Sequence, residues 1–218
     1  MKKGILIIFA LCISVHSFSQ NSVQAKKLLD EVSTKMGAYK NMYIEFSSSL
    51  INEDAGIKEN DELPIRATIT LQGELYNLDY QGNHFIFDGK KLYVINHEEQ
   101  EVNVTDNSDI EDDGFIYPSK LLTFYKEGYS FSMGKLKNYN GRKIQFVNLT
   151  PIDSSSEIVQ VKLGVDARTK HIYKLVQIGK NGSETTFTIN NFKSNVTVSV
   201  NLFTFDKEKY TKQNYTID

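Results

Sequence analysis

The sequence predicts a mainly β protein, in which one antiparallel sheet system of about eleven or twelve strands carries two or three helices. The chain has 12 Tyr and 13 Phe but only 3 Pro among 218 residues, and aromatic residues favour strands. From residue 41 onward, apolar and polar residues alternate with the period of a half-buried strand. Turn signals separate these runs roughly every 8–12 residues, as in a sandwich or barrel. The length fits one such domain.

The N-terminus has the three parts of a secretory signal peptide. Two lysines open the chain, an apolar run follows over Ile5–Val15, and serines then flank Phe18. The run is too short to span a bilayer, which takes roughly 20 helical residues. We therefore expect residues 1–19 to be removed and residues 20–218 to form a single domain. Cys12, the only cysteine, lies in the removed part, so the exported domain would have no disulfide.

An amphipathic helix is predicted at the start of the mature chain, with Ser22 as its N-cap and Gly37 near its end. Its apolar stripe recurs at helical spacing and consists of Ala25, Leu28, Leu29, Val32 and Met36. Such a stripe either packs permanently into the core or covers a space that is not always filled. Both interpretations stay open at this point.

The strands are predicted wherever apolar residues alternate with polar ones. Asp88-Gly89, Asn140-Gly141 and Asn181-Gly182 mark turns between them, because Gly adopts the positive φ that tight hairpins require. The predicted strands centre on residues 44–50, 65–71, 76–80, 85–87, 92–95, 102–104, 129–133, 144–146, 159–165, 172–178, 185–189 and 196–202.

A second, short helix interrupts the strands. Tyr117-Pro118-Ser119 opens it and Gly128 closes it, which is the usual placement of Pro and Gly at helix ends. It carries Leu121, Leu122 and Phe124, so it is apolar on much of its surface. We interpret it as a cover for the sheet.

Residues that would carry catalysis or bind a metal are not grouped in the sequence. The three histidines of the mature chain, His84, His97 and His171, are far apart, and no HExxH, CxxC, GxSxG or phosphate-binding glycine loop occurs. A calcium-loop pattern beginning at Asp109 fails because Lys120 stands where a bidentate Glu is needed. A net charge of −2 also gives no basic field for nucleic acid. We expect no catalytic residue, metal or cofactor, and a protein that binds something apolar and elongated.

Several segments resemble the family of the periplasmic outer-membrane lipoprotein carrier LolA. They are Gly73-Glu74-Leu75-Tyr76, then the run from His84 through Asp88-Gly89-Lys90 to Tyr93, then Glu99-Gln100-Glu101-Val102. The helix at Tyr117 is similar to the central helix of the family, and Thr204-Phe205 to its closing strand. The order of elements carries the resemblance, which covers nearly the whole mature chain.

The resemblance implies an unclosed antiparallel β-barrel with a helical lid over an apolar cavity. It also implies a monomer in the periplasm that receives lipoprotein acyl chains from an inner-membrane, ATP-driven releasing complex. The chains would be delivered to the outer membrane, with or without an acceptor there. One departure is that the family has an Arg-Pro, whose Arg helps to latch the lid, where this chain has Gln72-Gly73. We do not expect Arg66, which lies at the other end of the strand, to latch the lid.

The resemblance and the alternation together predict which residues meet the acyl chains. The cavity wall is predicted at Ile44, Phe46, Ile69, Leu71, Tyr76, Leu78, Phe85 and Phe87, and the lid at Leu28, Val32, Met36, Leu121, Leu122 and Phe124. The alternative for each of these residues is ordinary core packing.

Two other functions remain open at this stage. A lipid-sensing module of the RseB type could use the same scaffold, although such sensors add a second domain. A lipid hydrolase is the third hypothesis, and the lack of a paired Ser and His disfavours it.

Overall fold

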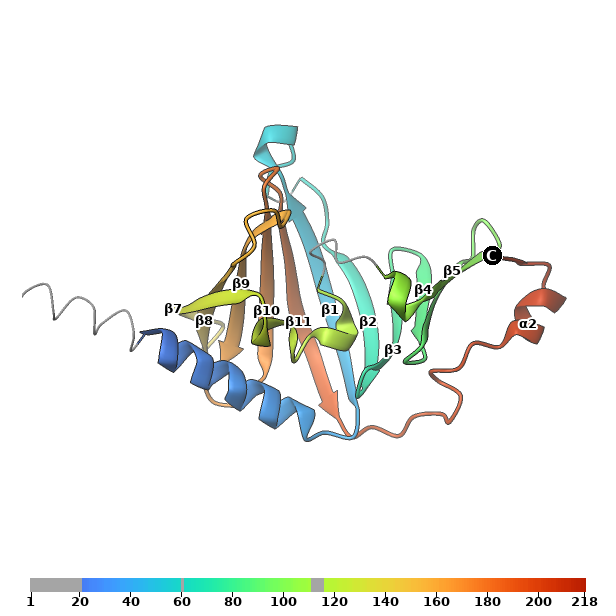
Figure 1. Ribbon diagram of the computed structural model, residues 1–218, viewed down its shortest axis with the longest axis horizontal. Coiled ribbons are helices and arrows are strands. Elements are labelled where there is room, and N and C mark those ends of the chain that lie inside the picture. Colours follow the sequence, from blue (N-terminus) through green and yellow to red (C-terminus); the bar gives the residue numbers. More distant parts are fainter. Residues whose placement is uncertain (1–20, 60, 111–115) are drawn as a thin grey trace, which may run out of the picture.

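The computed structural model describes residues 21–59, 61–110 and 116–218. The predicted signal peptide and Cys12 lie outside the described residues. Twelve strands of the described chain form one curved sheet (Figure 1). They are β1 (Met42–Ile51), β2 (Ile65–Gln72), β3 (Leu75–Tyr80), β4 (Asn83–Phe87), β5 (Lys91–Asn96), β6 (Glu101–Asp106), β7 (Tyr129–Tyr139), β8 (Arg142–Pro151), β9 (Ile158–Asp166), β10 (Ile172–Gly179), β11 (Glu184–Ser194) and β12 (Thr216–Ile217).

The strand order is β12-β6-β5-β4-β3-β2-β1-β11-β10-β9-β8-β7. Two antiparallel meanders, β1 to β6 and β7 to β11, are therefore joined through the antiparallel pairing of β1 with β11. The ends of the sheet, β12 and β7, do not pair with each other, so the barrel is unclosed. This confirms the predicted fold class.

The helices differ from the prediction in three respects. The first helix forms over residues 21–37, so Ser22 lies inside it and the prediction that Ser22 is its N-cap is wrong. The predicted second helix forms only two 3₁₀ turns, η3 (Pro118–Lys120) and η4 (Phe124–Lys126), with backbone hydrogen bonds from residue i+3 to residue i. A short segment with β-branched Thr123 between its two turns gains few α-helical bonds, which disfavours a full helix. The sequence did not predict the short helix α2 (Lys207–Lys212), which Asp206 caps.

The strand predicted at Val196–Leu202 is wrong, and so is the closing strand at Thr204-Phe205. Both lie in an extended loop, in which Val200 is 94% exposed. The side chain of Asn41 bonds to both backbone groups of Val196, with its Oδ1 accepting from N at 2.8 Å and its Nδ2 donating to O at 2.9 Å. The side-chain amide of Asn41 thus bonds the two backbone groups of Val196 that a neighbouring strand would otherwise pair.

Two hydrophobic clusters lie on opposite faces of the sheet. The larger one is on the concave face and includes the apolar stripe of the first helix and side chains from β1, β2, β3, β8, β9 and β10. The smaller one is built on Ile86, Ile95 and Val102 of β4, β5 and β6, and Tyr210 of α2 covers it. Because successive side chains of a strand point to opposite faces of the sheet, Ile86 and Ile95 lie on the other face from Phe87 and Leu92, which belong to the larger cluster. The concave face therefore holds the candidate site, and the C-terminal segment covers the other face at β4 to β6.

Candidate functional site

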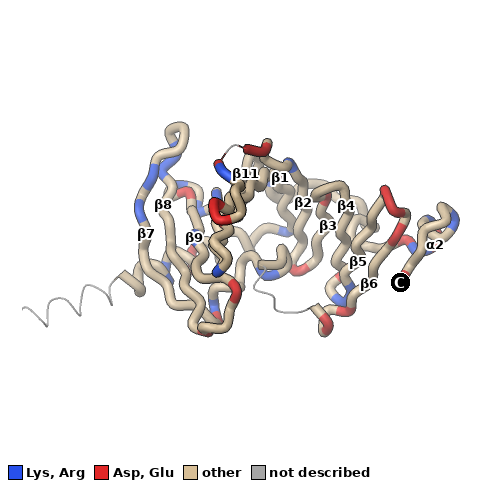
Figure 2. Tube along the Cα trace, turned by 90° about the horizontal axis from the view of Figure 1, so that it is seen from above, with Lys and Arg blue, Asp and Glu red and all other residues tan. Residues whose placement is uncertain are grey.

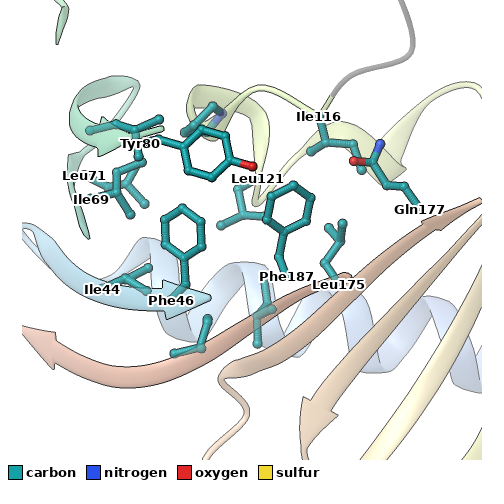
Figure 3. A pocket seen from close by; sticks show the side chains of 14 residues that line it. Ile44, Phe46, Ile69, Leu71, Tyr80, Ile116, Leu121, Leu175, Gln177 and Phe187 are labelled. Atoms are coloured by element: carbon teal, nitrogen blue, oxygen red, sulfur yellow. The ribbon is translucent and has the colours of Figure 1, made fainter. Parts of the chain in front are cut away.

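An apolar cavity lies between the concave face of the sheet and the segment after residue 115 (Figure 3). Its volume is about 120 Å³. An engineered apolar cavity of about 150 Å³ admits benzene, so this cavity is slightly smaller than a space known to hold one small apolar ring. The residues that line it are Ile44, Phe46, Ile69, Leu71, Leu78, Tyr80, Ile116, Pro118, Leu121, Ile172, Leu175, Gln177, Phe187 and Ile189.

Cross-strand pairing builds the wall of the cavity. Ile69 of β2 lies opposite both Ile44 of β1 and Leu78 of β3, so these three side chains stand in a row on one face. Leu175 of β10 lies opposite Phe187 of β11 in the same way. The β1–β11 pairing joins the two rows, which come from the two ends of the chain.

Aromatic rings narrow the middle of the cavity. Phe46 stacks on Tyr80 with ring centroids 6.1 Å apart, and it tilts against Phe187 at the same distance. The Tyr80 hydroxyl is paired with the hydroxyl of Ser48 at 3.0 Å, so the phenol brings no unpaired polar group to the wall. No lining residue carries a charge. A guest in this cavity would therefore be held by apolar contact and not by ion pairing.

Residues 116–126, here named the covering segment, form one side of the cavity. Ile116, Pro118 and Leu121 face into it, as Figure 3 shows for Ile116 and Leu121. Apart from the i+3 bonds of η3 and η4, the segment is fixed by side chains. The main anchor is Tyr125, which is 3% exposed.

Tyr125 ties the covering segment to the first helix. Its hydroxyl donates to the backbone carbonyl of Leu29 at 3.1 Å and lies 3.3 Å from Oδ1 of Asp30. Burial raises the pKa of the Tyr125 phenol, and the negative charge of Asp30 raises it further against the opposite effect of a hydrogen bond with Ser33. The hydroxyl therefore stays protonated and acts as a donor to the helix.

The match to known proteins agrees with this architecture. The model of the family described as outer membrane lipoprotein carrier protein LolA matches residues 76–206. The chain belongs to this family. The match runs from β3 to the residue that caps α2, and so includes the covering segment and most of the sheet. No curated protein matches the chain.

Solved structures resemble this LolA-family chain in fold. An uncharacterized conserved protein from Thermus thermophilus is 8% identical, with 89% of this chain and 98% of that chain covered and a TM-score of 0.59. A putative outer membrane lipoprotein-sorting protein domain from Vibrio parahaemolyticus is 12% identical, with 89% and 99% covered and a TM-score of 0.44. The LolA superfamily protein NE2245 from Nitrosomonas europaea is 12% identical, with 84% and 98% covered and a TM-score of 0.43.

The structure brings five of the eight predicted wall residues together around the cavity: Ile44, Phe46, Ile69, Leu71 and Leu78. Tyr76, Phe85 and Phe87 lie further along the same face, where Tyr76 stacks on Phe87 at 5.4 Å. Burial raises the pKa of Tyr76 strongly, and nearby Tyr117 adds to this effect. These three residues belong to the core beside the cavity, and their contact with a ligand stays a prediction.

The predicted lid residues separate into two groups. Leu121 lines the cavity, and Leu122 and Phe124 pack beside it against the core. Leu28, Val32 and Met36 of the first helix are at most 8% exposed and belong to the core. The sequence did not identify the lining residues from β10 and β11, because strand alternation does not say which distant strands pair.

The three described histidines have hydrogen-bond partners in different parts of the molecule. His84 bonds to Asp79, His97 to Tyr215, and His171 to Tyr39. Within the described ranges, no group of three His, Cys, Asp or Glu side chains could hold a metal ion. Among the helices of the same ranges, none is long and apolar enough to cross a membrane.

Proposed function

We propose that this LolA-family chain is a periplasmic carrier that binds lipoprotein acyl chains in the cavity and moves lipoproteins from the inner to the outer membrane. The observation that carries the proposal is a cavity without a charged lining residue, covered by a segment of two 3₁₀ turns. The description of the family supports it. The carrier would act as a monomer without catalysis or cofactor. It would receive its cargo from an ATP-driven inner-membrane complex and deliver it to the outer membrane, directly or through an acceptor.

The physical need for such a carrier follows from the hydrophobic effect. Each methylene group that leaves a bilayer for water costs about 0.8 kcal/mol. A chain of roughly a dozen methylenes therefore faces a barrier of about 10 kcal/mol. An apolar cavity removes most of this barrier. Because a volume of about 120 Å³ admits only part of such a chain, the covering segment has to move when a longer chain enters.

A substitution that fills the cavity tests the binding step. Ile189 of β11 faces the cavity, whereas its neighbour Thr188 lies on the other face of the strand, opposite Lys174. We expect Ile189→Trp to weaken binding of a fluorescent fatty acid by at least about tenfold. The matched control Thr188→Trp should change it less than about twofold. Equal affinities for the two variants would contradict the cavity as the binding site.

Depletion of the protein tests the transport step. The proposal predicts that lipoproteins then accumulate in the inner membrane. An Ile189→Trp copy should restore their transfer less well than a Thr188→Trp copy. Normal transfer without the protein would contradict the carrier role.

A lipid-sensing module is the second candidate, and the small cavity volume favours it. A sensor needs to hold only the end of one acyl chain, which the cavity admits without movement of the covering segment. This candidate predicts that the fatty acid binds as above while depletion leaves lipoprotein transfer unchanged. The two measurements therefore distinguish the candidates.

A further inference from the structure

The β7–β8 hairpin carries an uncompensated positive charge. Its strands contain Lys135, Lys137, Arg142 and Lys143 but no Asp or Glu, whereas the whole chain has a net charge of −2. All four side chains are exposed, and none of them makes an ion pair within the described part of the chain. Figure 2 shows these basic residues along the hairpin, at one end of the molecule.

Aromatic side chains lie beneath two of these cations, Lys137 and Arg142, on the face of the sheet opposite the cavity. The ring of Phe146 lies across Gly164, with ring atoms 3.0 and 3.1 Å from the place where a Cβ would stand. Tyr139 packs against Phe146 at 6.3 Å and against Tyr173 at 5.6 Å between ring centroids. Because a side chain at position 164 would displace the ring, this glycine makes the aromatic cluster possible.

Three cations sit over these three rings. Lys137 lies 5.6 Å from the ring centre of Phe146, Lys174 of β10 lies 5.4 Å from that of Tyr139, and Arg142 lies 5.8 Å from that of Tyr173. Lys137 is close enough to Lys174 to repel it. Burial lowers the pKa of Lys174, and the charge of Lys137 lowers it further, against smaller opposite effects of Glu184 and Glu59. An anionic surface would relieve this repulsion.

The same hairpin also exposes an apolar side chain. Leu136, between Lys135 and Lys137, is 56% exposed at the point where the β7–β8 register shifts. Its pairing with Gln145 places it on the same face of the hairpin as Lys143, whereas Lys137 and Arg142 lie on the other face. Basic side chains, an exposed Leu and Tyr rings that occur together on one hairpin are typical of a surface that binds an anionic bilayer. In such a surface the cations meet the lipid phosphates, and the apolar groups enter the headgroup layer. A purely acidic protein partner would use the cations but not the leucine.

We propose that the β7–β8 hairpin docks the protein on an anionic phospholipid surface. This inference goes beyond the carrier function and does not depend on it, because it concerns both faces of the hairpin and none of the residues that line the cavity. Each Lys or Arg near such a surface contributes about 1 kcal/mol, which is about fivefold in affinity. Salt would weaken the docking, because the Debye length falls with ionic strength.

Vesicle co-sedimentation tests the proposal. Purified protein is mixed with vesicles of phosphatidylcholine alone or with roughly 30% phosphatidylglycerol, at about 50 mM and about 500 mM salt. The first variant replaces the four hairpin cations by Gln: Lys135→Gln, Lys137→Gln, Arg142→Gln and Lys143→Gln. The matched control makes the same change in net charge at four exposed lysines elsewhere: Lys27→Gln, Lys58→Gln, Lys90→Gln and Lys207→Gln.

We expect the wild type and the control variant to bind the anionic vesicles at low salt, and the hairpin variant to bind them well over tenfold more weakly. Binding to neutral vesicles, and binding at high salt, should be weak for all three. Fatty-acid binding should be the same in the hairpin variant and the wild type, which separates this proposal from the carrier function and shows that the variant is folded. Equal losses in the two variants, or no preference for anionic vesicles, would overturn the proposal. So would salt-dependent binding to polyglutamate but not to the vesicles, which would indicate an acidic protein partner.

Discussion

The first helix and the covering segment both lie over the concave face of the sheet, but they are held in different ways. The helix buries Ala25, Leu29 and Met36 completely and is bound to the turn between β9 and β10 by the Glu31–Lys170 ion pair at 2.9 Å. In the covering segment, only Tyr125 is buried, and most of the apolar side chains are half-exposed. Sequence patterns identify both as apolar covers. The difference in burial indicates that the helix is a fixed part of the core and that the covering segment is the part able to move.

The largest expected effect concerns the helix. Met36→Ala should lower the free energy of unfolding by about 2–5 kcal/mol, because a fully buried side chain leaves a cavity. Urea denaturation measures this change, and Lys27→Ala on the exposed face should change it by less than about 0.5 kcal/mol. If Met36→Ala lowers the free energy of unfolding by less than about 1 kcal/mol, the helix is not a fixed part of the core and is able to move like the covering segment.

The second prediction concerns the covering segment. Leu121→Glu places a carboxylate in an uncharged cavity, so fatty-acid binding should weaken by at least about tenfold. The free energy of unfolding should change by less than for Met36→Ala, because Leu121 is only half-buried. Lys120→Glu, at the exposed neighbouring position, is the matched control. If Leu121→Glu binds fatty acid as the wild type does, the segment does not cover the binding site.

The hydroxyl of Tyr125 connects the two regions. Tyr125→Phe removes its hydrogen bond to the Leu29 carbonyl and should cost about 1 kcal/mol in the free energy of unfolding. Amide exchange in residues 116–126 should accelerate more than exchange in the first helix. Tyr139→Phe is the control, because the hydroxyl of Tyr139 has no hydrogen-bond partner within the described ranges. Unchanged exchange in the segment would mean that the hydroxyl does not hold it.

The smallest effect concerns the C-terminal end of the helix, where Tyr39 and His171 are hydrogen-bonded at 2.8 Å. Burial lowers the pKa of His171, and Lys35 lowers it further against an opposite effect of Asp166. The unfolded chain therefore binds the proton more readily, so stability should fall as the pH drops below the ordinary histidine pKa. The decrease in Tm between about pH 7.5 and about pH 5.5 should be smaller in Lys35→Gln and smallest in His171→Phe. A Tm that rises on acidification would contradict this assignment.

The alternation of apolar residues was enough to predict β1 to β11, because the apolar side chains of these strands fall mainly on one face, although β7 and β11 contain no fully buried residue. It failed at Val196–Leu202, where the same alternation occurs in an extended loop fixed by Asn41. It also missed β12, whose two residues are too few to show a period. The lining residues of β1 and β2 and Leu78 of β3 were found because neighbouring strands in sequence pair with each other, whereas Tyr80 of β3 was not. Those of β10 and β11 were not found, because their place beside β1 depends on a long-range pairing that no local pattern encodes.

Entry of an acyl chain into the cavity beneath the covering segment is what the carrier and the sensor both require. Nuclear Overhauser contacts between isotope-labelled fatty acid and methyl groups of the protein test this directly. We predict contacts from Ile69 on the wall and from Leu121 on the covering segment to the same bound chain, and loss of these contacts in Ile189→Trp. Contacts confined to exposed methyl groups such as those of Val200 or Leu63, with none from the cavity, would contradict binding beneath the covering segment.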